Sequence, residues 1–303
     1  MITQSLTGLI GNTPLLRLRR VERHLDLFSA LYSKLEGFNP SGSVKDRAAL
    51  FMIEDAFRKG KIREGGVVIE ATSGNMGISL SMLSAVYGYE ALIVMPESMS
   101  EERRALIRGY GGRLLLTDGA MGMAGAVERA EQLSSEISSA FRPSQFENPQ
   151  NPIAHYNTTG AEIYSTLPEV DIMVAGVGTG GTLIGAGRYL KEKRPSVRLV
   201  AVEPNESAVL SGGIASPHGI EGIGAGFYPP LFDGRLVDEV MTVSTEEARA
   251  ACRILGIREG VFAGFSSGAV LSAAISLARR SENYGKSIVM IFADGGEKYL
   301  SLL

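Results

Sequence analysis

The sequence predicts an α/β protein of two lobes, each with a mainly parallel sheet flanked by helices. Short apolar runs alternate with helical patterns of roughly ten to fifteen residues, which is the order of βαβ units. Residues 142–156 interrupt this alternation with three prolines, and 303 residues are too many for one small core. We therefore expect the chain to cross between two lobes at this interruption, with a ligand cleft between the lobes.

The elements before the interruption begin with two strand-like runs rich in leucine and aromatic residues. A helical pattern follows, and three strand–helix pairs come after it. The strands are expected at residues 13–18, 28–35, 67–70, 91–95 and 114–117. The helices are expected at residues 46–59, 77–87, 101–110 and 121–134.

The same alternation resumes after residue 156. Strands are expected at residues 172–175, 197–202, 240–243, 261–264 and 287–292. Helices are expected at residues 181–192, 246–255 and 267–280. Residues 206–230 are rich in Gly, Pro and Ser and are long for a plain connection, so we interpret them as an active-site loop.

Composition narrows the class of protein. Thirty Lys and Arg against 33 Asp and Glu give a net charge of −3, without the basic excess of a nucleic-acid or membrane-surface binder. The single cysteine, Cys252, lies in a helical pattern and cannot form an internal disulfide, which favours a reducing compartment. The N-terminus has no signal-peptide pattern, and no apolar run reaches the roughly 18 residues of a membrane span. We therefore predict a cytoplasmic protein.

A glycine-rich turn, GVGTGGT at residues 176–182, joins a predicted strand to a predicted helix. The N–H groups and the dipole of such a helix start favour phosphate binding. The turn also matches G-x-G-x-x-G, with Glu203 about twenty residues on, so a nicotinamide-dependent dehydrogenase is a rival interpretation. Thr179 and Thr182 add hydroxyl donors that suit a terminal phosphate, while the alternative without a ligand is a tight turn.

Two further turns precede predicted helices. GFSSG at residues 264–268 matches the serine-hydrolase elbow, but all three histidines precede Ser266, which is the wrong chain order for that mechanism. Ser266 is then either a helix N-cap or a hydroxyl directed at a ligand. TSGNMG at residues 72–77 combines two hydroxyls, an amide and helix-start N–H groups, which favours an anion site over capping alone.

Lys45 lies at the start of a predicted helix, in NPSGSVKDR at residues 39–47. The helix dipole disfavours a lysine there and lowers its pKa, which favours the neutral amine that forms a Schiff base with an aldehyde. The alternative is an ordinary solvated lysine.

The chain resembles the fold-type II pyridoxal-phosphate enzymes, whose fold is that of the tryptophan synthase β subunit, and among them the cysteine synthases. The resemblance covers nearly the whole length and follows nine segments in order. They are IGNTPLLRL, KLEGFNPSGSVKDR, ATSGNMGI, MPESMSEERR, QFENPQNP, GVGTGGT, GIGAGF, GFSSGA and GEKYLS.

The resemblance implies pyridoxal 5′-phosphate as cofactor and no metal ion. Lys45 would bind the cofactor covalently and act as acid and base at the substrate α-carbon. The other cofactor contacts would be Asn75 at the 3′-oxygen, Gly178, Thr179, Gly180, Gly181 and Thr182 at the phosphate, and Ser266 at the ring nitrogen. Thr72, Ser73, Asn75 and Gln145 would bind the substrate α-carboxylate, and Gly222 would lie near the substrate amine.

The implied domains are a smaller, mobile one of residues 40–145 and a larger one of residues 1–39 plus 146–303. Two positions depart from the usual pattern. Met76 replaces a threonine of the carboxylate turn, which leaves a backbone contact or a more apolar pocket there. Ala293-Asp294-Gly295 replaces a Pro- and Ser-containing stretch near the ring nitrogen.

The activity that the resemblance implies is conversion of O-acetylserine and sulfide to cysteine and acetate. The alternatives on the same fold are an O-phosphoserine sulfhydrylase, a cystathionine β-synthase, a cysteine desulfidase and a diaminopropionate synthase. A non-enzymatic binding module and the dehydrogenase are the alternatives outside it. The family is typically homodimeric, and serine acetyltransferase is a possible partner.

Overall fold

The computed structural model describes residues 2–302, and its contacts divide them into two units. One unit contains residues 2–10, 39–151 and 298–302, and the other contains residues 11–38 and 152–297. Both units alternate strands with helices, so the predicted α/β class with two mainly parallel sheets is confirmed. That residues 40–145 move as a smaller domain stays a prediction.

The first unit is built on a four-stranded parallel sheet in the order β5-β4-β3-β6. Its strands are β3 (Val67–Ala71), β4 (Glu90–Pro96), β5 (Arg113–Thr117) and β6 (Ala140–Phe141). Side chains alternate between the two faces, so Val68 and Ile93 pack in one core and Ile69 and Val94 in another. The first core lies against α2 (Lys45–Arg58), α3 (Asn75–Tyr87) and α4 (Glu101–Gly109), and the second lies against α5 (Gly122–Glu136).

The second unit is built on a six-stranded sheet in the order β1-β2-β10-β7-β8-β9. Only the β1–β2 pair is antiparallel among the described strands of this sheet. The strands are β1 (Leu15–Arg17), β2 (Ala30–Leu35), β7 (Ile172–Gly176), β8 (Arg198–Pro204), β9 (Glu239–Val243) and β10 (Ser287–Phe292).

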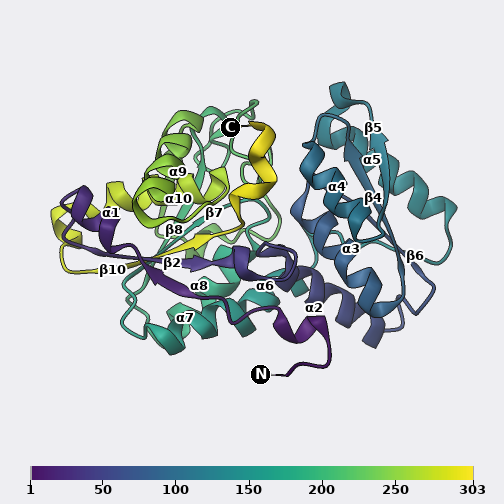
Figure 1. Ribbon diagram of the computed structural model, residues 1–303, viewed down its shortest axis with the longest axis horizontal. Coiled ribbons are helices and arrows are strands. Elements are labelled where there is room, and N and C mark those ends of the chain that lie inside the picture. The colour runs from purple at the N-terminus through teal and green to yellow at the C-terminus, as the bar shows by residue number, and fades with distance from the viewer. Residues whose placement is uncertain (1, 303) are drawn as a thin grey trace. The chain divides into compact units, whose positions relative to one another are not determined.

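Helices cover both faces of this second sheet, as Figure 1 shows with α7 and α8 below it and α9 and α10 above it. These helices are α7 (Ala161–Thr166), α8 (Gly181–Lys193), α9 (Thr245–Glu259) and α10 (Phe265–Ala278). Helix α10 is apolar almost all round and is buried except at Ser272 and Ser276, because it lies between the sheet and α9. The central strands are accordingly apolar on both faces, as expected for parallel sheets.

The prediction of a strand at residues 261–264 is wrong. Ala263 forms one isolated bridge with Gly295, and Gly296 N–H donates to the Phe262 carbonyl (3.1 Å). This segment makes only single contacts with residues 294–296, which follow β10, and Phe262 is exposed. The sequence patterns also missed the short helices α1 (Arg19–His24), α6 (Gln150–His155) and α7, because six residues carry too little periodicity.

The predicted functional turns follow strand ends in both sheets. The turn after β3 leads into α3, and the turn after β7 leads into α8. The predicted loop at residues 206–230 is largely confirmed, since no helix or strand occurs between Ala208 and Asp233. None of the helices within residues 2–302 has the length and apolarity that crossing a bilayer requires.

Candidate active site

Lys45 is the first residue of α2, at the end of a turn that buried polar groups hold in place. The backbone N–H of Lys45 donates to the Ser43 hydroxyl (3.3 Å), and its side chain is half-buried. The buried carboxylate of Asp46 accepts from the Ser41 N–H (2.7 Å) and from the Ser79 hydroxyl (2.6 Å). Burial raises the pKa of Asp46, against the opposing effect of these hydrogen bonds. The Lys45 backbone is therefore fixed by the turn.

The turn of residues 72–75 leads into α3. The N-cap of α3 is Gly74, so no side chain at that position caps the helix. Thr72 is buried, and its Oγ1 accepts from the Gly74 N–H (3.2 Å), whereas Ser73 is half-buried and its hydroxyl makes no hydrogen bond within residues 2–302. Because neither hydroxyl caps the helix, the capping interpretation of this turn does not hold. The helix-start N–H groups and these side chains can bind an anion such as a carboxylate.

Asn75, the first residue of α3, contacts a residue that the sequence reasoning did not single out. The Lys298 Nζ donates to Asn75 Oδ1 (3.1 Å) and to the Gly42 carbonyl (2.9 Å), three residues before Lys45. Lys298 is 1% exposed. It therefore joins the turn that carries Lys45 to the turn that carries Asn75.

Gln145 is held close to the same turn by a buried carboxylate. Glu70, near the end of β3, accepts from the backbone N–H groups of Ser144 (3.0 Å) and Gln145 (3.2 Å). Complete burial raises the pKa of Glu70 to about 7, although these hydrogen bonds and Arg142 oppose the shift. Asn151 Nδ2 also donates to the Gln145 carbonyl (2.8 Å). The structure thus brings Gln145 to the end of the strand that leads into Thr72.

Met76 does not contribute its side chain to this turn. It is 1% exposed and packs in the apolar core with Ile78 and Met82. The Met76 side chain is thus occupied by core packing, and a backbone contact of this residue to a carboxylate stays a prediction.

The glycine turn of residues 176–182 lies in the second unit and leads into α8. Its N-cap, Gly180, has a φ of +83°, a left-handed conformation that favours glycine, and Thr179 Oγ1 accepts from the Gly181 N–H (3.3 Å). A Cβ added to Gly178 would lie 2.5 Å from the Gly222 carbonyl oxygen. Two predicted site segments, 178–182 and Gly222, are therefore in close contact.

Thr182 contacts a buried histidine. Its Oγ1 lies 3.2 Å from His155 Nε2, and His155 Nδ1 lies 2.9 Å from Thr159 Oγ1. His155 is 1% exposed and comes from α6, which the sequence patterns did not predict. The imidazole thus fixes the hydroxyl of one residue predicted to bind phosphate.

Ser266 is the second residue of α10, and it is not the helix N-cap. The N-cap is Gly264, which receives no side-chain capping bond, so the capping interpretation of Ser266 is wrong. Ser266 is 5% exposed, and among the described residues its hydroxyl has no hydrogen-bond partner. A buried hydroxyl of this kind can serve a ligand.

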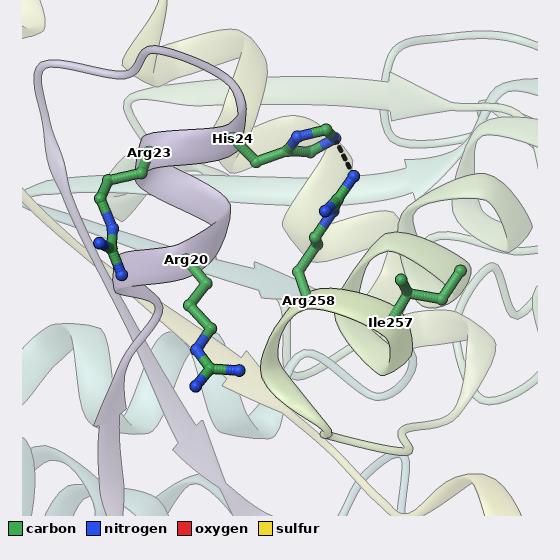
Figure 2. Close-up of a pocket in the computed structure, with 5 residues that line it drawn as sticks. All are labelled: Arg20, Arg23, His24, Ile257 and Arg258. Carbon is green, nitrogen blue, oxygen red and sulfur yellow. Dashed lines mark hydrogen bonds between the residues drawn. The ribbon is translucent and has the colours of Figure 1, made fainter.

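A separate pocket of about 560 Å³ opens beside α1 and the end of α9, and Figure 2 shows the residues that line it. They are Arg20, Arg23, His24, Ile257 and Arg258, with Arg258 Nη2 3.4 Å from His24 Nε2. This pocket is basic, lies in the second unit and contains none of the predicted site residues.

Comparison with known proteins identifies the family. Residues 6–294 match the family described as "Pyridoxal-phosphate dependent enzyme". The chain belongs to this family. A protein named cysteine synthase from Staphylococcus aureus is 46% identical over 98% of this chain and 95% of its own length.

Two solved structures have the same fold as this family member. The crystal structure of a cysteine synthase from Entamoeba histolytica has a TM-score of 0.96 and 42% identity, covering 99% of this chain and 90% of that chain. A hydrogen sulfide-producing enzyme from Fusobacterium nucleatum has a TM-score of 0.95 and 43% identity, covering 99% and 100% of the two chains.

The described residues fit the chemistry of the family's cofactor, pyridoxal phosphate. The turn before α8 and the start of α8 carry backbone N–H groups and threonine hydroxyls that suit a phosphate. Gly178 in this turn packs so closely against Gly222 that a Cβ would not fit. Lys45 carries an amine of the kind that reacts with an aldehyde, and Ser266 carries a buried hydroxyl that could face a ring nitrogen. Among residues 2–302, no group of three His, Cys, Asp or Glu side chains could hold a metal ion.

Three residues that contact predicted site residues were not predicted from the sequence: Lys298, Glu70 and His155. Lys298 lies in the segment GEKYLS, which was part of the resemblance, but no periodicity or turn pattern marks a lysine 256 residues from its partner Gly42. Glu70 lies in a buried apolar strand, where a carboxylate is rare without partners, and that was the available signal.

Proposed function

We propose that this chain is a cysteine synthase, which replaces the acetate of O-acetyl-L-serine with sulfide and releases L-cysteine. The observation that carries this proposal is the match, over almost the full length of both chains, to a relative of that name at 46% identity. The presence in this chain of Lys45 at the start of α2, the carboxylate-type turn before α3 and the phosphate-type turn before α8 supports it.

The proposed reaction divides among residues of this chain. When bound, pyridoxal phosphate withdraws electrons from the substrate α-carbon and so stabilises negative charge there. Lys45 Nζ takes the proton from that α-carbon, the bond from the β-carbon to acetate breaks, and sulfide forms a bond to the β-carbon. Lys45 then returns a proton to the α-carbon, which gives cysteine and acetate.

The other proposed roles are binding and orientation. Thr72, Ser73, Asn75 and Gln145 hold the substrate α-carboxylate, and Glu70 keeps Gln145 in place through its backbone N–H. Gly178, Thr179, Gly180, Gly181 and Thr182 hold the cofactor phosphate, Ser266 faces the ring nitrogen, and Gly222 approaches the substrate amine. A serine at the ring nitrogen does not enforce ring protonation, which favours β-elimination over transamination.

A second candidate function is release of hydrogen sulfide from cysteine. It is favoured by the Fusobacterium nucleatum enzyme of that description, which matches this chain over its whole length at 43% identity. Both reactions begin with proton removal at the α-carbon and loss of the β-substituent, so the same residues serve either.

The experiment compares substrates on the purified holoenzyme. We expect rapid cysteine formation from O-acetylserine and sulfide, little from O-phosphoserine, and slow sulfide release from cysteine. Sulfide release faster than cysteine formation would reassign the chain to the second function. No product from either serine ester would refute the proposed substrate class.

Lys45→Ala tests the central residue. We expect this variant to bind pyridoxal phosphate without a covalent bond and to lose turnover. Mass spectrometry after borohydride reduction should find the cofactor on Lys45 in the unaltered chain. Reduction that attaches it to another lysine would refute the assignment.

We further propose that the chain is a cytoplasmic homodimer and that serine acetyltransferase is a candidate partner. The support is the family resemblance, together with a single cysteine that cannot form an internal disulfide. Analytical ultracentrifugation of the chain alone, and then with serine acetyltransferase, measures both associations.

A further inference from the structure

Lys298 places a buried ammonium group between two turns of the first unit. It lies in the 3-10 helix Gly296–Leu302, and its Nζ donates to the Gly42 carbonyl (2.9 Å) and to Asn75 Oδ1 (3.1 Å). A buried ammonium needs a compensating charge. Burial raises the pKa of Asp46, and the charge of Lys298 is among the effects that oppose this shift, so the two groups interact favourably. The ammonium is thus part of a buried polar cluster.

This contact decides which end of the Asn75 carboxamide faces a ligand. An amide has an acceptor oxygen and a donor nitrogen at nearly equivalent positions, and rotation by half a turn exchanges them. An ammonium group only donates, so it can pair only with the oxygen. With Oδ1 bonded to Lys298, the Nδ2 end, which carries two N–H donors, points away from the ammonium and can donate to an anionic oxygen.

The position of Lys298 is itself fixed, because its segment is anchored to the start of α4. The Ser100 hydroxyl donates to the Lys298 carbonyl (3.4 Å), and the Arg103 guanidinium lies 4.8 Å from the centre of the Tyr299 ring. Two residues later, the Ser301 N–H donates to Glu102 (2.9 Å). The ammonium is therefore held from its backbone side as well as by its acceptors.

We propose that Lys298 is a positioning residue that sets the Asn75 carboxamide so that its N–H donates to the anionic ring oxygen of the cofactor. The inference rests on the proposed role of Asn75 at the 3′-oxygen. Lys298 itself acts through Asn75 and does not take part in proton transfer. Removal of Lys298 allows the carboxamide to rotate and present its oxygen to an anion, which is repulsive.

A double-mutant cycle on cofactor affinity tests this proposal. The variants are Lys298→Met, Asn75→Ala and the two combined, and the readout is the Kd of the apoprotein for pyridoxal phosphate, from an absorbance titration. We expect each single change to weaken binding about ten-fold, as for the loss of a charge-assisted or ligand hydrogen bond. We expect the double variant to match Asn75→Ala within about two-fold, because Lys298 acts only through that side chain.

Two further variants keep the result interpretable. Lys286 Nζ donates to Asn283 Oδ1 (3.1 Å) outside the predicted site, so Lys286→Met removes a contact of the same kind and should leave the Kd unchanged. Lys298→Gln keeps a neutral donor and should recover part of the affinity. It replaces Lys298→Met in the cycle if that variant does not fold.

The outcomes separate the two proposals. If Asn75→Ala leaves the Kd unchanged, the assignment of Asn75 to the cofactor is wrong. If Asn75→Ala weakens binding but Lys298→Met does not, or if the two effects multiply in the double variant, Lys298 has only a structural role and the inference is overturned.

Discussion

Replacement of Gly178 by alanine should separate two glycine segments that the structure packs together. The added Cβ would lie 2.5 Å from the Gly222 carbonyl oxygen, a distance that real Cβ atoms essentially never show. Relief requires a shift of about 1 Å, because non-bonded carbon contacts are ordinarily about 3.5 Å. Both partners are backbone, and the Gly224 N–H donates to the Val177 carbonyl (3.0 Å), so neither segment moves freely.

The magnitude follows from overpacking in a well-packed region, which costs about 1–3 kcal/mol. We expect thermal unfolding of Gly178→Ala to begin several degrees lower, and the Kd for pyridoxal phosphate to rise about ten-fold, since the α8 start must shift. Differential scanning calorimetry and a cofactor titration of the apoprotein measure these two effects.

The matched control is the same substitution at Gly256, in the exposed part of α9. A Cβ there meets nothing within 4 Å, and alanine favours a helix interior over glycine by about 1 kcal/mol, so Gly256→Ala should stabilise the protein. If Gly178→Ala leaves both unfolding temperature and cofactor affinity as they were, close packing of the two segments is not what requires glycine at position 178.

Two further predictions concern buried titrating groups. The pKa of Glu70 is raised by burial from 4.5 to about 7, so the folded state holds a proton that the unfolded state has lost. Stability should therefore fall as the pH rises from 4.5 to 7, by up to about 3 kcal/mol. Denaturant unfolding should show this loss reduced in Glu70→Gln, and an unaltered pH dependence would contradict the assignment. Burial raises the pKa of Cys252 to about 11, and its thiol donates to the Gly264 carbonyl (3.4 Å). Its alkylation at pH 8 should be slow in the native protein and fast after denaturation, and equal rates would show that the thiol is not protected.

The local features of this fold could be read from the sequence because they depend on nearest neighbours. Helices such as α2 and α10 carry apolar residues over several turns, and the parallel strands β7 and β10 are short and, apart from Ser287, apolar. The glycine and hydroxyl turns were visible because their residue types suit a helix start. The strand prediction for residues 261–264 was wrong because four residues before a helix can have the composition of a strand whether or not a partner strand is present.

Tertiary structure alone decided which buried groups support the candidate site. Glu70 holds the backbone of Gln145, which is 75 residues away, and Lys298 contacts Asn75 at a separation of 223 residues. The apolar strand around Glu70 indicates that it is buried, but nothing local identifies the partners of Glu70 or Lys298, because those partners come from other elements. The sequence by itself determined the alternation of elements and the residue types at each turn. Which charges are buried, and therefore which pKa values and side-chain orientations are fixed, depends on how those elements pack.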